Sequence, residues 1–326
     1  MRRREVIKAI AGAAAAWPFA AHAQPAAMPV IGMLHSQTQA SEAARIPSIE
    51  QGLRDAGYTV GRNVAIEHRF ADGLNDRLPA LAAELVQRRV NVIFANTTPP
   101  AYAAKAATST IPIVFATGVD PVEVGLVASM NRPGGNITGV TFLSNKLVAK
   151  RLELLSLLIP ANTPIGMLAA RRNPNTETDS RDTLAAAAAL GRTVHIETVS
   201  PDGSIEDAIE ALIQKRAGAL FVAPQADFRM WRQQLVLLAA RHRLPTSFSS
   251  SDHVTAGGLM SYGPDQDNSY REAGLYTGRV LKGEKPASLP VLVATKFEFA
   301  INLNAAKALG LTIPPPMLAL ATNVIE

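Results

Sequence analysis

The chain has 326 residues, of which 48% are apolar and 18% are charged, and its formal net charge is +5. This length leaves room for two globular units with their own cores, and the composition excludes intrinsically disordered and collagen-like proteins. Cysteine is absent, which excludes disulfide scaffolds, iron–sulfur clusters, thiol nucleophiles and the lipidated cysteine of a bacterial lipoprotein.

The first 23 residues have the three-part order of a signal peptide. Basic residues at 2–8 precede an alanine-rich run at 9–16, and Ala21-His22-Ala23 offers a small-residue cleavage site. The apolar run is too short to span a bilayer stably. Arg3 to Lys8 resembles the twin-arginine export motif, which predicts export to the periplasm and a mature chain beginning at Gln24. The alternative is an amphipathic start of a cytoplasmic protein.

Cleavage after Ala23 would remove most of the basic character. The leader carries four of the 32 basic and one of the 27 acidic residues, so the net charge would fall from +5 to +2. No later cluster of Lys and Arg is interleaved with aromatic residues. We therefore expect no nucleic-acid partner and no stable membrane insertion.

Short, branched apolar runs alternate with helical patterns from Pro29 onward, which is typical of βαβ units and parallel sheets. A first series of strands is expected at 30–34, 64–68, 90–94, 113–115 and 137–141, with helices at 41–56, 75–87 and 99–107. Asp120, Pro121 and Glu123 form a capping-box pattern that predicts a further helix, ended by the Asn131–Asn136 turn.

A second series with the same rhythm follows a helix expected at about 146–158. Its strands are expected at 165–169, 194–198, 219–222 and 246–249, and its helices near 177–190, 205–215 and 228–241. In the C-terminal tail, strands are expected at 257–263, 291–293 and 298–301, and helices at 269–281 and 304–309. The fold class is therefore α/β, with two Rossmann-like lobes of parallel strands joined by a three-segment hinge. We expect residues 28–140 plus 252–285 in the N-terminal lobe and residues 141–251 plus 286–326 in the C-terminal lobe.

Ligands of open parallel sheets bind beyond the carboxyl ends of the strands, where this chain carries small polar residues. Hydroxyls and helix N-termini there can receive a carboxylate, aspartates can balance an ammonium group, and a tyrosine can cover an apolar portion. The predicted ligand-binding residues are Ser36, Thr97, Thr98, Thr117, Asp120, Asp227, Asp252 and Tyr262. Each serine, threonine and aspartate in this set is also explicable as a helix cap or turn residue, Asp120 most completely, so the set carries more weight than any member.

The sequence contains no nucleophile elbow, phosphate loop, zinc-protease helix or dinucleotide fingerprint. The histidines lack metal-ligand spacing. Asp252 and His253 with a serine of 249–251 could form a hydrolytic group, but adjacent strand residues point to opposite faces. We predict no catalytic residue, no metal site and no cofactor.

Several segments resemble substrate-binding proteins of ABC importers, in the type I periplasmic-binding-protein-like group that includes bacterial tryptophan receptors. The most specific is Asn131–Val140, with the sequence NRPGGNITGV, and the resemblance covers nearly the whole chain. The other segments are 28–32, 51–58, 78–82, 111–115, 256–263 and 305–311.

The resemblance implies a two-lobed receptor that closes on a small solute and presents it to a permease in the inner membrane. We expect a monomer without enzymatic activity, binding an amino acid or a related carboxylate. Two alternatives remain open: a periplasmic ligand-sensing subunit of a signalling system, and an α/β hydrolase.

Overall fold

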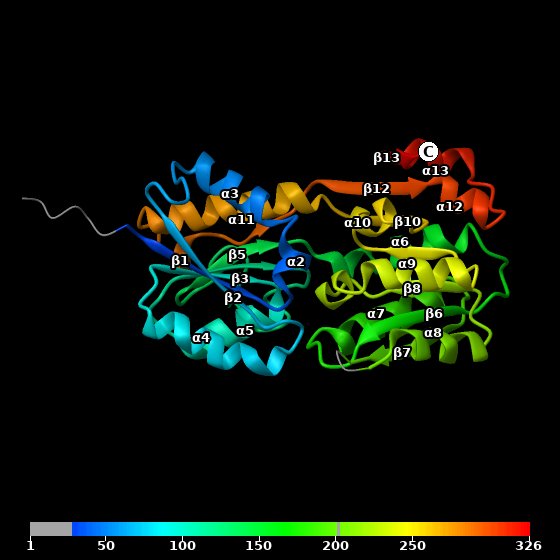
Figure 1. The fold of residues 1–326 in the computed structure, drawn as a ribbon, viewed down its shortest axis with the longest axis horizontal. Helices are drawn as coiled ribbons and strands as arrows, with labels where there is room; N and C mark the ends of the chain where they lie inside the picture. The colour runs from blue at the N-terminus through cyan, green and yellow to red at the C-terminus, as the bar shows by residue number, and fades with distance from the viewer. Residues whose placement is uncertain (1–27, 201–202) are drawn as a thin grey trace, which may run out of the picture.

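Residues 28–200 and 203–326, which the computed structural model describes, form two α/β lobes placed end to end (Figure 1). The predicted signal peptide at 1–23 lies outside the described residues. None of the helices in the described part is long and apolar enough to cross a membrane. The fold class predicted from the sequence is confirmed.

The first lobe contains a six-stranded parallel sheet covered by helices on both faces. Its strands are β1 (Val30–His35), β2 (Ala65–Phe70), β3 (Val92–Asn96), β4 (Ile113–Thr117), β5 (Ile137–Thr141) and β11 (Leu292–Val293). Its helices are α2 (Gln39–Glu42), α3 (Ile46–Asp55), α4 (Leu78–Gln87), α5 (Thr98–Ala107) and α11 (Gln266–Leu281), with 3-10 turns η1 (Asn75–Arg77) and η4 (Pro286–Ser288). The strand order is β11-β5-β4-β3-β1-β2, and every pairing is parallel.

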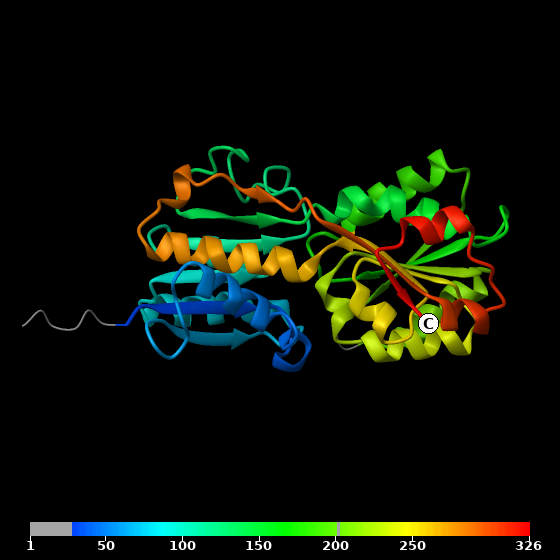
Figure 2. The same cartoon turned by 90° about the horizontal axis from the view of Figure 1, so that it is seen from above.

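The strand residues of this sheet alternate between two cores. Ile31 and Met33 of β1 pack with α3 and α11, whereas Leu34 packs with α4 on the opposite face. Helices α3 and α11 approach so closely that a Cβ on Gly52 would lie 1.8 Å from the carbonyl oxygen of Arg271. Only glycine allows this contact, which fixes α11 along the first lobe (Figure 2).

The second lobe contains a seven-stranded sheet with its own core. Its strands are β6 (Ile165–Ala170), β7 (Val194–Val199), β8 (Ala219–Val222), β9 (Thr246–Phe248), β10 (Met260–Pro264), β12 (Phe297–Asn302) and β13 (Asn323–Ile325). Its helices are α6 (Val148–Ser156), α7 (Thr176–Ala189), α8 (Ile205–Gln214), α9 (Arg232–Arg241), α10 (Ser251–Thr255), α12 (Leu303–Ala308) and α13 (Pro315–Leu320), with η2 (Ser144–Leu147) and η3 (Ala226–Arg229). The order is β13-β12-β10-β9-β8-β6-β7; β12 and β13 run opposite to the other five strands, and the β10–β12 pairing is the antiparallel one in this sheet.

Three segments connect the lobes (Figure 2), and two of the predicted lobe boundaries, at residues 252 and 286, differ from the structure. Strand β10 pairs with β9 and β12, so residues 252–264 belong to the second lobe and the chain crosses at Asp265. Strand β11 pairs with β5, so residues 286–293 stay with the first lobe and the last crossing lies at 294–296. The second crossing ends at Asp265, directly before α11 begins. The Asp265 carboxylate caps this helix by accepting the Asn268 N–H at 2.9 Å.

The helix predicted after Asp120 is wrong, although its capping interaction forms. The Asp120 carboxylate accepts the N–H groups of Val122 and Glu123 at 2.9 and 3.2 Å. Gly125 then adopts a left-handed φ of +68°, and the N–H of Leu126 returns to the carbonyl of Pro121. One turn therefore forms and closes on itself before a helix can propagate.

Candidate functional site

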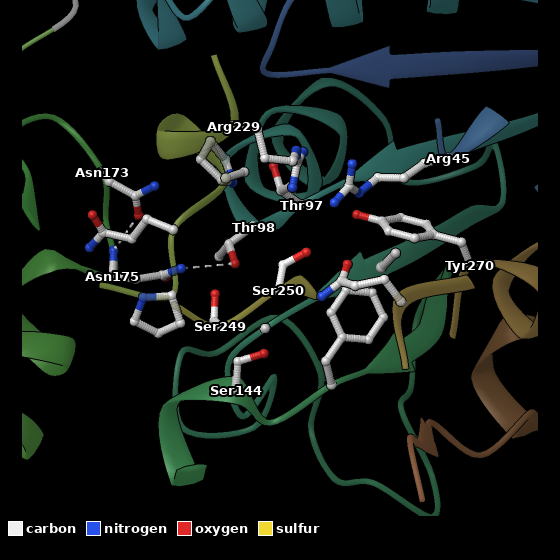
Figure 3. Close-up of a pocket in the computed structure, with 18 of the residues that line it drawn as sticks. Arg45, Thr97, Thr98, Ser144, Asn173, Asn175, Arg229, Ser249, Ser250 and Tyr270 are labelled. Atoms are coloured by element: carbon white, nitrogen blue, oxygen red, sulfur yellow. Dashed lines mark hydrogen bonds between the residues drawn. The ribbon is translucent and has the colours of Figure 1, made fainter. Parts of the chain in front are cut away.

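A small cavity of about 60 Å³ lies at the boundary between the lobes (Figure 3). Its lining residues come from the loops at the strand ends of both sheets, from the start of α3 and from α11. The polar residues that line it are Arg45, Thr97, Thr98, Ser144, Asn173, Asn175, Gln225, Arg229, Ser249, Ser250, His253, Gln266 and Tyr270. The remaining lining residues are Pro99, Ala116, Gly118, Phe142, Pro224 and Ala226.

Thr97 and Thr98, both predicted from the sequence, line the cavity where β3 passes into α5. Thr97 has φ +102° and ψ 173°, a conformation that is costly for a β-branched residue. Such strain is typical of ligand sites, where the surrounding structure holds the backbone in place. It turns the chain sharply, so that α5 begins at the cavity with its free N–H end.

Ser36 and Thr117 do not line the cavity, but their hydroxyls contact those of the two threonines on the side away from it. The hydroxyl oxygens of Ser36 and Thr97 are 3.1 Å apart, and those of Thr117 and Thr98 are 2.6 Å apart. Thr98 Oγ1 also accepts the side-chain amide of Asn175 at 3.3 Å. Because Asn175 belongs to the second lobe, this contact joins the two lobes inside the site.

The remaining four predicted residues also lie outside the cavity lining. Asp120 is held by backbone amides of its own turn, and Tyr262 stacks on Phe297 with ring centroids 6.5 Å apart. Asp227 accepts the Asn173 side-chain amide at 2.6 Å. Burial raises the pKa of Asp227, and this hydrogen bond opposes the rise. Asp252 faces neighbouring surface hollows instead.

Two arginines that sequence reasoning missed bring positive charge to the cavity. Arg45, which is 3% exposed, precedes α3 in the first lobe and donates through Nη2 to Asp252 Oδ2 at 2.7 Å. Arg229 of η3 in the second lobe donates through Nη2 to Glu42 Oε1 at 2.5 Å. Each pair joins one lobe to the other, so both arginines link the site to closure of the lobes.

The Glu42–Arg229 pair is the more deeply buried, with Glu42 fully inaccessible and Arg229 10% exposed. Burial would raise the pKa of Glu42, but the charges of Arg229 and Arg45 outweigh it and the pKa lies below its usual value. Glu42 also accepts the Asn96 amide at 2.6 Å. The carboxylate is therefore ionised and fully partnered when the lobes are together.

Tyr270 and Phe142 supply the aromatic surface of the cavity. Their rings meet edge to face with centroids 5.4 Å apart, and the guanidinium of Arg45 lies 5.8 Å from the Tyr270 ring centre. Burial raises the pKa of Tyr270, so its hydroxyl stays protonated and can donate.

The hydrolytic arrangement considered from the sequence does not assemble. His253 Nε2 lies 3.3 Å from the carbonyl oxygen of Phe228, and its ring stacks on Phe248. Neither His253 Nδ1 nor Ser250 Oγ has a hydrogen-bond partner in the described part of the chain. Within residues 28–200 and 203–326, no group of three acidic or histidine side chains is placed to hold a metal ion.

Two parallel-sheet lobes with a polar cavity between them define a two-lobed ligand-binding protein of the type I periplasmic-binding-protein fold. The chain belongs to the ABC transporter substrate binding protein family, whose family model matches residues 37–325. The resemblance noted in the sequence is thereby confirmed.

Individual relatives agree with this assignment. A tyrosine-binding protein of Clostridioides difficile is 30% identical over 263 residues, which cover 80% of this chain and 75% of the relative. A conserved domain protein from Vibrio cholerae has a TM-score of 0.85 at 27% identity, covering 91% of this chain and 99% of that one. An ABC domain from Streptococcus pneumoniae, solved in complex with L-Trp, has a TM-score of 0.82 at 28% identity with the same coverage.

Proposed function

We propose that this protein is the exported solute receptor of an ABC importer, which binds a small carboxylate-bearing solute between its lobes and delivers it to an inner-membrane permease. The observation that carries the proposal is the polar cavity lined from both lobes and bordered by interlobe ion pairs. A solute that touches both walls stabilises the closed form, which is how ligand binding shifts such an equilibrium. Membership of the substrate-binding family supports the same role.

The proposal includes export to the periplasm, a monomeric state and the absence of chemical turnover. The leader pattern at 1–23 supports export. Replacing both Arg3 and Arg4 by lysine in a leader fused to a folded reporter tests the route. Loss of periplasmic reporter would indicate the twin-arginine pathway, whereas retained export would indicate general secretion.

The binding test follows thermal unfolding of the chain from Gln24 against amino acids, aromatic and aliphatic carboxylates, sugars and polyamines. A solute at 100 times its dissociation constant should stabilise the native state by about 2.7 kcal/mol. The solute should be recovered chemically unchanged. Absence of any shift, or turnover of the compound, would contradict the receptor function.

A cavity-filling variant provides the matched control. Gly118 lines the cavity, and a Cβ there would meet Ser144 Oγ at 3.5 Å, an ordinary contact. Gly118→Leu should lose the thermal shift because its side chain occupies the solute's space, and its unfolding temperature without solute shows whether the fold is kept. An unchanged shift would place binding elsewhere on the protein.

A further inference from the structure

The cavity lining is rich in hydrogen-bond donors and cations, and this bears on the class of solute. Arg45 and Arg229 line the cavity, whereas among the described residues no aspartate or glutamate does. The inference drawn from this asymmetry rests on the proposed function, because it concerns the ligand of the same cavity.

The donors converge on one end of the cavity. Arg45 Nε and Nη1 and Arg229 Nε are buried and have no partner among the described residues. The Arg45 guanidinium and the Tyr270 hydroxyl point into the space beside Thr97, at the N-terminus of α5 (Figure 3). Unpaired, buried cationic N–H groups are costly, and an anion accepting from them forms strong charge-assisted bonds. This end of the cavity suits a carboxylate.

An ammonium group would find no anionic partner in the lining. The three aspartates predicted to balance one are engaged elsewhere: Asp120 by backbone amides, Asp227 by Asn173 and Asp252 by Arg45. The lining residue next to Asp227 is Ala226, which carries no charge. A buried ammonium would thus lose its hydration beside two guanidinium groups without gaining a counter-charge.

The buried acceptors of the lining that lack a partner are neutral. Asn175 Oδ1 is one of them. A carbonyl can only accept, so the 3.3 Å contact with Phe228 places the proton of His253 on Nε2 and leaves Nδ1 as an acceptor. Burial lowers the pKa of His253 to about 4, so the ring stays neutral. These acceptors suit an uncharged hydroxyl or N–H group.

We propose that the solute is an organic carboxylate without a free α-ammonium group, held at its acid end by Arg45, Tyr270 and the start of α5. A neutral hydroxyl or N–H group elsewhere on the solute pairs with Asn175 or His253. The cavity thereby discriminates against amino acids that differ from such acids only by the ammonium group.

Matched pairs of compounds test this discrimination by calorimetric titration of the chain from Gln24. The pairs are 3-phenylpropanoate with L-phenylalanine, 3-(4-hydroxyphenyl)propanoate with L-tyrosine, and 4-methylpentanoate with L-leucine. In any pair that binds, the deaminated acid should bind at least about 10-fold more tightly, equivalent to about 1.4 kcal/mol. Tighter binding of the amino acid would overturn the inference while leaving the receptor function intact.

A variant that restores the missing charge gives a second, independent measurement. Ala226→Asp places a carboxylate in the cavity wall, and Ala226→Asn places a neutral group of similar shape there. The aspartate variant should shift preference toward the amino acid by at least 10-fold, and the asparagine variant by less than 3-fold. Equal shifts would show that charge does not set the preference, which would overturn the inference.

Failure of the receptor function and failure of the proposed solute class give different results. If no member of any pair binds and the wider solute panel is also negative, the receptor function itself fails. If the panel reveals a solute that carries an ammonium group or has no carboxylate, the receptor function stands and the proposed solute class is wrong.

Discussion

Glu42→Gln should weaken solute binding by opening the lobes, because it removes the anionic half of the buried pair with Arg229. When the lobes are together, Glu42 is inaccessible and Arg229 is 10% exposed, with N and O 2.5 Å apart. Glutamine keeps the size of the side chain and can still accept from Asn96, but it leaves the Arg229 charge without an anion. Opening relieves this cost because Arg229 then returns to water.

The size of the effect follows from the burial of the pair. Removing one partner of a buried ion pair costs about 3 kcal/mol at the low end of measured values. For a receptor that is open without solute, the whole cost falls on the closing step, which is about 150-fold in apparent affinity. The direction of the Glu42 pKa shift agrees, since the nearby arginine charges outweigh burial and favour the ionised form.

The absence of cysteine makes the measurement direct. Ala83→Cys on α4 and Glu210→Cys on α8 place two exposed labelling sites on different lobes, and energy transfer between the dyes reports closure. Both proteins should reach the same closed signal at saturation. The solute concentration for half-closure should rise about 150-fold in Glu42→Gln.

Asp76→Asn is the matched control, because it breaks the exposed interlobe pair with Arg172, whose side chains are 85% and 58% exposed. Exposed pairs contribute little, so half-closure should move less than about 3-fold. A rise of less than 5-fold in Glu42→Gln, or an equal rise in both variants, would refute the role of the buried pair in closure.

Three further outcomes concern the fold. Gly52→Ala should destabilise the protein by about 2 kcal/mol in urea unfolding, because the new Cβ would meet the Arg271 carbonyl at 1.8 Å. Replacing glycine by alanine within a helix usually has the opposite effect and raises stability. Burial raises the pKa of Asp179 to about 7, so the folded protein loses stability as pH rises from about 4 to 7. In unfolding experiments, Asp179→Asn should therefore gain stability relative to the unchanged protein over that range, and the difference should level off above it. Thr97→Gly should be about 1 kcal/mol more stable than Thr97→Ala, since both lose the contact with Ser36 but only glycine tolerates φ +102°; the reverse order in unfolding experiments would count against backbone strain.

Strand positions were predictable because burial on both faces leaves a strong signal in the sequence. Continuous apolar runs such as residues 30–34 and Ile165–Ala170 are what a covered parallel sheet requires. The lobe crossings were less predictable, because strand pairing decides them. Nothing local in Met260–Pro264 distinguishes pairing with β9 from pairing in the first sheet, so the second crossing was placed too early.

The expectation that ligands bind beyond the carboxyl ends of the strands located the site but not all of its lining residues. Thr97 and Thr98 follow β3 and line the cavity, while Ser36 and Thr117 occupy the same loop positions and support them from behind. That expectation could not find Arg45, which immediately precedes a helix. An arginine in that position is usually a solvated residue, but here Tyr270 of the first lobe and Asp252 of the second contact the guanidinium, and the side chain is 3% exposed.

The charge of the site shows why position alone could not determine the ligand. The sequence places Asp227 and Asp252 in loops that reach the lobe boundary, which favoured a zwitterionic solute. In the fold Asp227 is bonded to Asn173, and Asp252 pairs with Arg45 across the boundary. Two Arg45 nitrogens nevertheless have no hydrogen-bond partner within residues 28–200 and 203–326, because a guanidinium has five N–H donors and a single carboxylate contact uses only part of them. Within the described residues, pairing therefore uses the carboxylate oxygens more completely than the guanidinium nitrogens, and this excess of donors is the basis on which we propose a carboxylate solute.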